Sequence, residues 1–309
     1  MLNRDDLIIK VATLFYEADL TQTEIAKRLK ISRPTVSHLL KEAKDKGIVR
    51  ISIQHSKMNI TKMQSEIALK YNLKNVLISP KSHGTLLDKN LVGSLCAEFI
   101  EQIAPTISSL GIGWGTTMYE FVQSASYTNF SDLEIIPLMG GFGISDVKFH
   151  SNHLAFQLAE KYNCSVVYFY APAFAESIEV KHTFESTNLV QEIYKKGKSV
   201  DLAITGVGNP AKTSTYQRLG YISTEEKEKI KSSTIIGDVL ATLFDRDGNS
   251  VSTPISDRMM GMTLEDLEMV KEVLVVASGE EKIISVEALL NKGFIDYLII
   301  DEEIANGLV

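Results

Sequence analysis

The 309 residues include 44% hydrophobic and 23% charged side chains and have a formal net charge of −7 at pH 7, as expected of an ordinary globular protein. No apolar run approaches the roughly 20 residues that a membrane-spanning helix needs. The first ten residues, MLNRDDLIIK, do not have the pattern of a secretory signal, so we expect a cytoplasmic protein. Two cysteines, Cys96 and Cys164, provide neither a disulfide framework nor a metal-ligand spacing, and we therefore expect no metal and no redox chemistry.

Length and charge distribution both indicate two domains. Residues 1–56 contain ten Lys and Arg against seven Asp and Glu, a balance of +3, whereas the remaining residues contain 22 against 32, a balance of −10. A positive excess at one end suggests a segment that faces nucleic acid, joined to a domain of another kind. We place the domains at 1–56 and 57–309.

The first domain begins with three predicted helices. Residues 4–18 repeat apolar side chains at helical spacing. A second helix follows Thr21, which has Glu24 at the spacing of a capping box. A third helix follows Ser32 as its N-cap, with Pro34 in the first turn, where a missing N–H is tolerated.

Two short helices joined by a tight turn are typical of a helix-turn-helix. The outward side chains of the third helix suit base edges and phosphates of a DNA major groove. The alternating segment IVRISIQH after Gly47 predicts the strand of a winged variant. A helical bundle with a merely solvated polar face is the alternative. The predicted DNA-binding residues are Arg33, Thr35, Ser37, His38 and Lys41.

After a predicted connecting helix at 58–72, the pattern of the chain changes. Continuous apolar, β-branched runs alternate with helical segments, which predicts a parallel sheet covered on both faces, a doubly wound α/β domain. The predicted strands are NVLIS, TISSLGIG, LEIIPLMGG, CSVVYFY, VDLAITGVG, IIGDVLATLF, EVLVVASG and DYLII, and the predicted helices lie at 85–102, from Thr116, from about Asn152 and at 280–291.

Ligands of such sheets bind where the carboxyl ends of strands lead into helices. The segment GIGWGTT lies at one such end, with Gly113 and Gly115 allowing close backbone approach and Thr116 and Thr117 opening a helix. Free N–H groups, two hydroxyls and the helix dipole together favour an anion, typically phosphate. A tight turn without a ligand is the alternative reading.

Other strand ends repeat this pattern. Gly206 and Gly208 end one strand, Lys282 follows another, and Asp238 interrupts an apolar run. A cation at a helix start opposes the dipole, so Lys282 either meets a bound anion or reaches to solvent as a surface lysine. Asp238 either binds a sugar hydroxyl or makes a structural hydrogen bond to the backbone.

These motifs occur in an order that resembles the SorC family of bacterial transcriptional regulators over nearly the whole chain. Among those that carry the resemblance are LTQTEIAKRLKISRPTVSHLLKEAKDKGIV, GIGWGTT, IIPLMGG, DLAITGVG, GDVLATLFDRDG and VLVVASGEEKIISVEALLNKGF. The resemblance implies a DNA-binding head and a Rossmann-like effector domain related to phosphosugar isomerases. It also implies a dimer or tetramer on operator DNA that responds to a phosphorylated sugar.

The resemblance assigns roles by motif. It places Gly113, Gly115, Thr116 and Thr117 at the phosphate, and the sugar-side residues would be Gly206, Gly208, Asp238 and Lys282. Some relatives carry a lysine that can form a Schiff base at the position of Met139, so we expect no covalent capture of the effector there.

An enzyme remains the alternative function, because the effector domain resembles isomerases and deaminases. Deaminases of this type carry Asp-Gly-His after the Gly-x-Gly turn, and that turn here continues as GVGNPAKTS, with neither Asp nor His. We therefore expect a regulator without catalytic residues or cofactor, whose operator binding is controlled by a phosphorylated sugar.

Overall fold

The computed structural model describes residues 4–46, 48–49, 57–82, 85–141, 146–212 and 222–309. The chain divides into two compact units, Met1–Ser56 and Lys57–Val309. Most of the predicted wing strand in IVRISIQH lies outside the described residues. None of the helices in the described ranges is long and apolar enough to cross a membrane.

The first unit contains the three predicted helices, and their caps are confirmed. The side chain of Thr21 accepts a hydrogen bond from the Glu24 N–H while Glu24 accepts one from the Thr21 N–H, which completes the capping box. Ser32 caps the third helix by accepting from the Thr35 N–H at 3.2 Å. The helices are α1 (Arg4–Tyr16), α2 (Gln22–Leu29) and α3 (Arg33–Asp45).

A small apolar core holds these helices together. It is formed by buried side chains from all three, with Val36, Leu39, Leu40 and Ala43 on the inward face of α3. The opposite face of α3 is therefore left to solvent, as the sequence predicts.

The second unit is built on a parallel sheet of seven strands, in the order β1-β9-β8-β5-β2-β3-β4, which confirms the predicted α/β class. Since all seven strands run in the same direction, their carboxyl ends meet at one edge. The strands are β1 (Asn75–Ser79), β2 (Ser109–Ile112), β3 (Glu134–Pro137), β4 (Ser165–Val166), β5 (Leu202–Gly206), β8 (Val273–Ala277) and β9 (Tyr297–Asp301).

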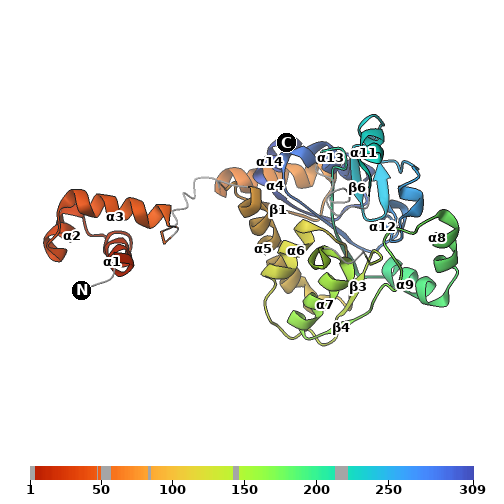
Figure 1. The fold of residues 1–309 in the computed structure, drawn as a ribbon, viewed down its shortest axis with the longest axis horizontal. Coiled ribbons are helices and arrows are strands. Elements are labelled where there is room, and N and C mark those ends of the chain that lie inside the picture. The colour runs from red at the N-terminus through yellow and green to blue at the C-terminus, as the bar shows by residue number, and fades with distance from the viewer. Residues whose placement is uncertain (1–3, 47, 50–56, 83–84, 142–145, 213–221) are drawn as a thin grey trace. The chain divides into compact units, whose positions relative to one another are not determined.

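Helices cover both faces of this sheet (Figure 1). One face packs against α5 (Thr85–Ile103), α6 (Thr116–Ser124) and α7 (Ser151–Tyr162). The other face packs against α4 (Lys57–Tyr71), α9 (Asn188–Lys198), α12 (Leu264–Leu267), α13 (Ile283–Lys292) and α14 (Glu302–Leu308).

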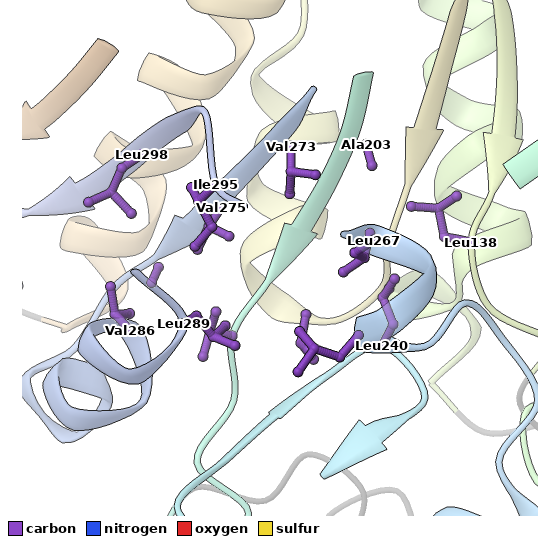
Figure 2. Packing of buried hydrophobic residues seen from close by; sticks show 14 of the residues in the cluster. Leu138, Ala203, Leu240, Leu267, Val273, Val275, Val286, Leu289, Ile295 and Leu298 are labelled. Atoms are coloured by element: carbon purple, nitrogen blue, oxygen red, sulfur yellow. The ribbon is translucent and has the colours of Figure 1, made fainter. Parts of the chain in front are cut away.

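Alternate residues of each strand enter opposite cores, as strand geometry requires. In β8, Val273 and Val275 lie in the cluster on the α13 side, which Figure 2 shows together with Val286 and Leu289 of that helix. Leu274 lies in the cluster on the α6 side. Burial on both faces explains why the strands read as continuous apolar runs.

One segment predicted as a strand of the parallel sheet lies outside that sheet. The segment IIGDVLATLF does not join the main sheet but forms a separate antiparallel hairpin of β6 (Gly237–Val239) and β7 (Thr242–Phe244). Its turn includes Leu240, which adopts a left-handed φ of 46°. The segment is mostly apolar because the hairpin is itself buried, and so its composition resembles that of a sheet strand.

Other differences are smaller. Only Ser165 and Val166 of CSVVYFY pair as a strand, and the predicted helix at 280–291 begins as a 3₁₀ turn, Glu280–Lys282, before α13. Several helices of the second unit were not predicted from the sequence, among them α8 (Ile178–Glu185), α9 and α11 (Thr224–Lys231). They are short and follow Ser or Thr caps.

Candidate DNA and effector sites

The predicted DNA-binding residues lie together on the exposed face of α3. All five side chains, those of Arg33, Thr35, Ser37, His38 and Lys41, are exposed, and four of them fall within the first two turns of the helix. The N-terminal turns of a recognition helix are the part that contacts base edges in this type of domain. The exposed face of α3 is therefore available for such contacts.

The structure adds Arg4 to this surface. Arg4 of α1 lines the same cavity as Thr35 and His38, and its Nη2 atom is 3.0 Å from Glu42 Oε2 of α3. Sequence patterns could not indicate this, because the proximity arises only when α1 packs on α3. Lys46, by contrast, pairs with Asp5 at 2.8 Å.

In the second unit, three neighbouring strands carry the predicted effector residues to one edge of the sheet. The strands β2, β5 and β8 are adjacent, and they are followed by the GIGWGTT segment, by the turn with Gly208 and by Lys282. Because β5 lies between β2 and β8, the glycine turn of β5 is flanked by the other two segments.

The start of α6 is open. Gly115 is its N-cap with a left-handed φ of 103°, and no side chain of the described residues caps the helix. No atom of the described residues lies within 4 Å of a Cβ atom built on Gly115. Thr116 is half-buried and Thr117 is buried. The first N–H groups of a helix lack intrahelical acceptors, so this start can receive an anion.

The two glycines of this segment have their own N–H groups occupied. The Gly113 N–H donates to the Ile204 carbonyl at 2.8 Å, and the Gly115 N–H donates to the Phe149 carbonyl at 2.9 Å. A Cβ atom on Gly113 would lie 3.1 Å from Leu240 and 3.2 Å from Thr205 Oγ1. Gly113 therefore serves close packing, whereas Gly115 leaves room above the helix start.

Asp238 is held over the end of β5 by the hairpin. The Gly208 N–H donates to the Asp238 carbonyl at 2.9 Å, and the Asp238 N–H donates back at 3.2 Å. A Cβ atom on Gly208 would lie 2.1 Å from Asp238 Oδ1, so only glycine leaves space for this carboxylate. Gly206 is the last residue of β5, two positions before Gly208, and a Cβ atom on it would have ordinary spacing to Val276.

Lys282 is buried, and the surface-lysine reading is therefore wrong. Lys282 is only 7% exposed. Among the described residues, none makes a hydrogen bond or an ion pair with its ammonium group. Burial, followed by repulsion from Lys89, lowers the pKa of Lys282 to about 8, although Glu281, Asp238 and Asp301 oppose the shift. At neutral pH the side chain is thus mostly a buried cation without a direct partner, an arrangement that favours a ligand with an acceptor atom.

Neighbouring polar residues fix the turn that carries Lys282. Asp301, at the end of β9 and 1% exposed, accepts hydrogen bonds from the Gly279 N–H at 2.7 Å and the Ile304 N–H at 2.9 Å. Asn209 donates to the Glu281 carbonyl at 2.8 Å and so ties the β5 end to the β8 end. Sequence reasoning missed Asp301, although a polar residue after an apolar strand is a readable signal.

Two further features concern the expectations of no covalent capture at Met139 and no metal site. Met139, where we expected no covalent capture of the effector, is fully buried and packs in a cluster with Trp114. Within the described ranges, no group of three or more His, Cys, Asp or Glu side chains is arranged to hold a metal ion.

Comparison with known proteins agrees with both units. Residues 56–309 match a family described as "Putative sugar-binding domain", and residues 11–50 match winged helix-turn-helix DNA-binding domains. The chain is 32% identical to the deoxyribonucleoside regulator of Bacillus subtilis, over 99% of this chain and 98% of that protein. It is 26% identical to the sorbitol operon regulator of Klebsiella pneumoniae, over 100% of both chains.

The fold comparison points the same way. The full-length sorbitol operon regulator SorC from Klebsiella pneumoniae has a TM-score of 0.76 at 24% identity, covering 100% of this chain and 99% of that one. A helix-turn-helix unit joined to a sugar-binding unit defines a DNA-binding transcriptional regulator with a sugar effector. The chain belongs to the SorC family of bacterial transcriptional regulators.

Proposed function

We propose that the protein regulates genes of carbohydrate metabolism and that a phosphorylated sugar, bound at the carboxyl edge of the sheet, controls its binding to operator DNA. The observation that carries this proposal is Lys282, a buried residue whose ammonium group has no direct partner among the described residues and which lies at the same sheet edge as the start of α6, where no described side chain caps the helix. The names of the two relatives, a deoxyribonucleoside regulator and a sorbitol operon regulator, support an effector related to sugars.

Each part of the effector then has a recognition group. The phosphate lies at the start of α6, where Thr116 and Thr117 add hydroxyls to the helix N–H groups. Asp238 accepts hydrogen bonds from sugar hydroxyls, and Lys282 donates to an oxygen of the sugar. Gly208 and Gly206 form the floor between them.

In the first unit, we assign the operator contacts to α3. Arg33, Thr35 and His38 face the major groove, while Ser37 and Lys41 extend the polar surface along the helix. The matched winged helix-turn-helix family supports this assignment. We further propose that the protein acts in the cytoplasm as a homo-oligomer whose paired recognition helices contact two half-sites of the operator.

We assign no catalysis to the sheet edge. Where isomerase-like deaminases carry an acid and a histidine, this chain has Asn209, and both ends of its amide are engaged: the Nδ2 atom donates to the Glu281 carbonyl, and the Oδ1 atom accepts from the Lys212 N–H at 3.2 Å. An amide in two structural hydrogen bonds cannot act as a general base. The site therefore binds its ligand without converting it.

A thermal-shift screen of sugars against their phosphates tests the effector class. A ligand present at about 100 times its dissociation constant stabilises the folded state by about 2.7 kcal/mol. We expect stabilisation by a sugar phosphate and little by the same sugar without phosphate. Equal stabilisation by both forms would contradict the phosphate assignment, and turnover of the stabilising ligand would contradict the assignment as a non-enzyme.

A further inference from the structure

The effector residues described so far provide a helix start and two hydroxyls for the phosphate, and no lysine or arginine has yet been assigned to it. A helix start contributes roughly half an elementary charge, and phosphate groups in proteins are usually also met by Lys or Arg. The position of Lys89 in the structure fills this gap.

The packing of α5 on α6 determines where Lys89 lies. A Cβ atom on Gly93 of α5 would be 2.6 Å from the Glu120 carbonyl carbon of α6, so the two helices touch closely there. Further along, the Ser94 hydroxyl donates to Ser124 at 3.2 Å, and the Ser126 N–H donates to Glu101 at 2.7 Å. The paired residue numbers rise together, and the helices therefore run in the same direction.

This register brings Lys89 to the open helix start. Lys89 lies one turn before Gly93, and Thr116 lies one turn before Glu120, a displacement of about 6 Å along each helix. Lys89 is therefore beside Thr116, at the level of the first turn of α6. Figure 1 shows the two helices next to each other on the same face of the sheet.

The electrostatics of the neighbours agree with this placement. Burial raises the pKa of Glu120, and Lys89 and Lys148 oppose that shift. Lys89 also lowers the pKa of Lys282, after burial. Lys89 thus lies within electrostatic reach of both the α6 side chains and Lys282.

Both lysines have no direct partner in the described ranges. Lys89 is half-buried, and no ion pair or hydrogen bond joins it to another described residue. The buried Lys282 has none either. Two cations that repel each other, one of them almost fully buried, are unfavourable in the empty protein and become favourable when an anion lies between them.

We propose that Lys89 is a further effector-binding residue, which contacts the phosphate group at the start of α6 and faces Lys282 across the bound ligand. This inference rests on the proposed function and adds to it the residue that supplies the charge. Two lysines and a helix start match the two negative charges of a phosphate monoester. A neutral sugar would leave both cations without a counter-charge.

Inorganic phosphate is the probe for the test, titrated by calorimetry into the full-length protein at constant ionic strength. We expect Lys89→Gln to weaken phosphate binding at least about tenfold, as loss of a charge-assisted hydrogen bond should, and Lys89→Arg to retain it. The matched control is Lys148→Gln, which removes an equal charge from an exposed lysine that also acts on Glu120. We expect the control to bind phosphate like the wild type.

The outcomes separate the inference from the proposed function. Unchanged binding in Lys89→Gln, together with loss of binding in Thr116→Ala plus Thr117→Ala, would overturn the role of Lys89 and leave the phosphate site standing. Equal weakening in Lys89→Gln and Lys148→Gln would also overturn it, because a general field effect would then suffice. No binding of phosphate by the wild type would overturn both.

A second measurement needs no variant. Lysine acetylation of the wild-type protein, followed by mass spectrometry, should show that phosphate protects Lys89 and leaves the labelling of Lys148 unchanged. Labelling of Lys89 that does not respond to phosphate, in a protein that binds phosphate, would overturn the assignment.

Discussion

At the scale of single residues, Lys282 lowers the stability of the ligand-free fold and is also a proposed contact of the effector. A change of its pKa from the ordinary 10.5 to about 8 corresponds to about 3 kcal/mol that the ligand-free fold loses at neutral pH. The folded-state pKa lies below the unfolded-state value, so the penalty is fully present below pH 8 and is relieved as the pH rises from 8 to 10.5. A bound ligand with an acceptor atom or a negative charge would offset this penalty.

We therefore expect Lys282→Met to raise the free energy of unfolding at pH 7 by up to about 3 kcal/mol and to abolish effector binding. The gain in stability should fall to roughly half or less at pH 9.5, because the wild-type lysine is then neutral in the fold. Urea unfolding at the two pH values measures this. A variant that is no more stable than the wild type at pH 7 would contradict the buried, unpaired state of the lysine.

In the first unit, we expect the loss of Arg33 to lower the affinity for DNA more than the loss of any other predicted contact. We expect Arg33→Ala to weaken operator binding about tenfold or more, because a bidentate arginine contact to a base contributes about 1–3 kcal/mol of discrimination. Lys10→Ala, an exposed change on α1, is the control and should have a small effect. Fluorescence anisotropy with a DNA site selected by the protein from a random pool measures both. Unchanged affinity in Arg33→Ala would remove it from the interface.

At the scale of elements, the caps of α2 and α3 were readable from sequence because a cap involves residues three positions apart. Ser32 and Thr35, like Thr21 and Glu24, interact within one turn whatever the rest of the fold does. The hairpin was not readable in this way. Its turn has the left-handed φ at Leu240, where Gly or Asn would have signalled a turn, and its burial arises from tertiary packing.

The N-cap of α3 carries a prediction at this scale. We expect Ser32→Ala to destabilise the first unit by about 1 kcal/mol, because the Thr35 N–H loses its acceptor. The second unit should be unaffected, since the change lies wholly within Met1–Ser56. Hydrogen exchange followed by peptide mass spectrometry resolves the two units. An effect confined to the second unit would contradict the local nature of the cap.

The effector site shows a similar division between local and tertiary information. Glycines and threonines after a strand mark the end of β2 and could be selected from the sequence. The proposed role of Lys89 could not be predicted, because no motif surrounds that residue and its place depends on how α5 packs on α6. The hydrogen bond from the Gly113 N–H to the Ile204 carbonyl was not predictable either, because it joins separate strands.

At the scale of the whole molecule, function requires that two sites in one chain share a coupling free energy, typically about 1–3 kcal/mol in regulators. The effector edge and the recognition helix belong to different compact units. In the proposed homo-oligomer, the arrangement of the subunits couples the two sites, which predicts that changes at the effector site alter the response and leave the basal DNA affinity intact.

Thr116→Ala plus Thr117→Ala should therefore bind the selected DNA with wild-type affinity and lose the response to the effector. The proposed site assigns these hydroxyls to the phosphate and the operator contacts to α3, so the two readouts should separate. A variant that responds normally would place the phosphate elsewhere. If the variant fails to bind DNA in the absence of effector, that result would contradict the separation of the two sites.

The most direct test of the central claim is one anisotropy titration. Wild-type protein on its selected DNA is titrated with the sugar phosphate that stabilises it most, and in parallel with the same sugar without phosphate. We expect the phosphorylated form to change the DNA dissociation constant about fivefold or more, as a coupling of at least about 1 kcal/mol requires, and the unphosphorylated form to change it little. Identical DNA affinity with and without the sugar phosphate would contradict a regulator controlled by this ligand.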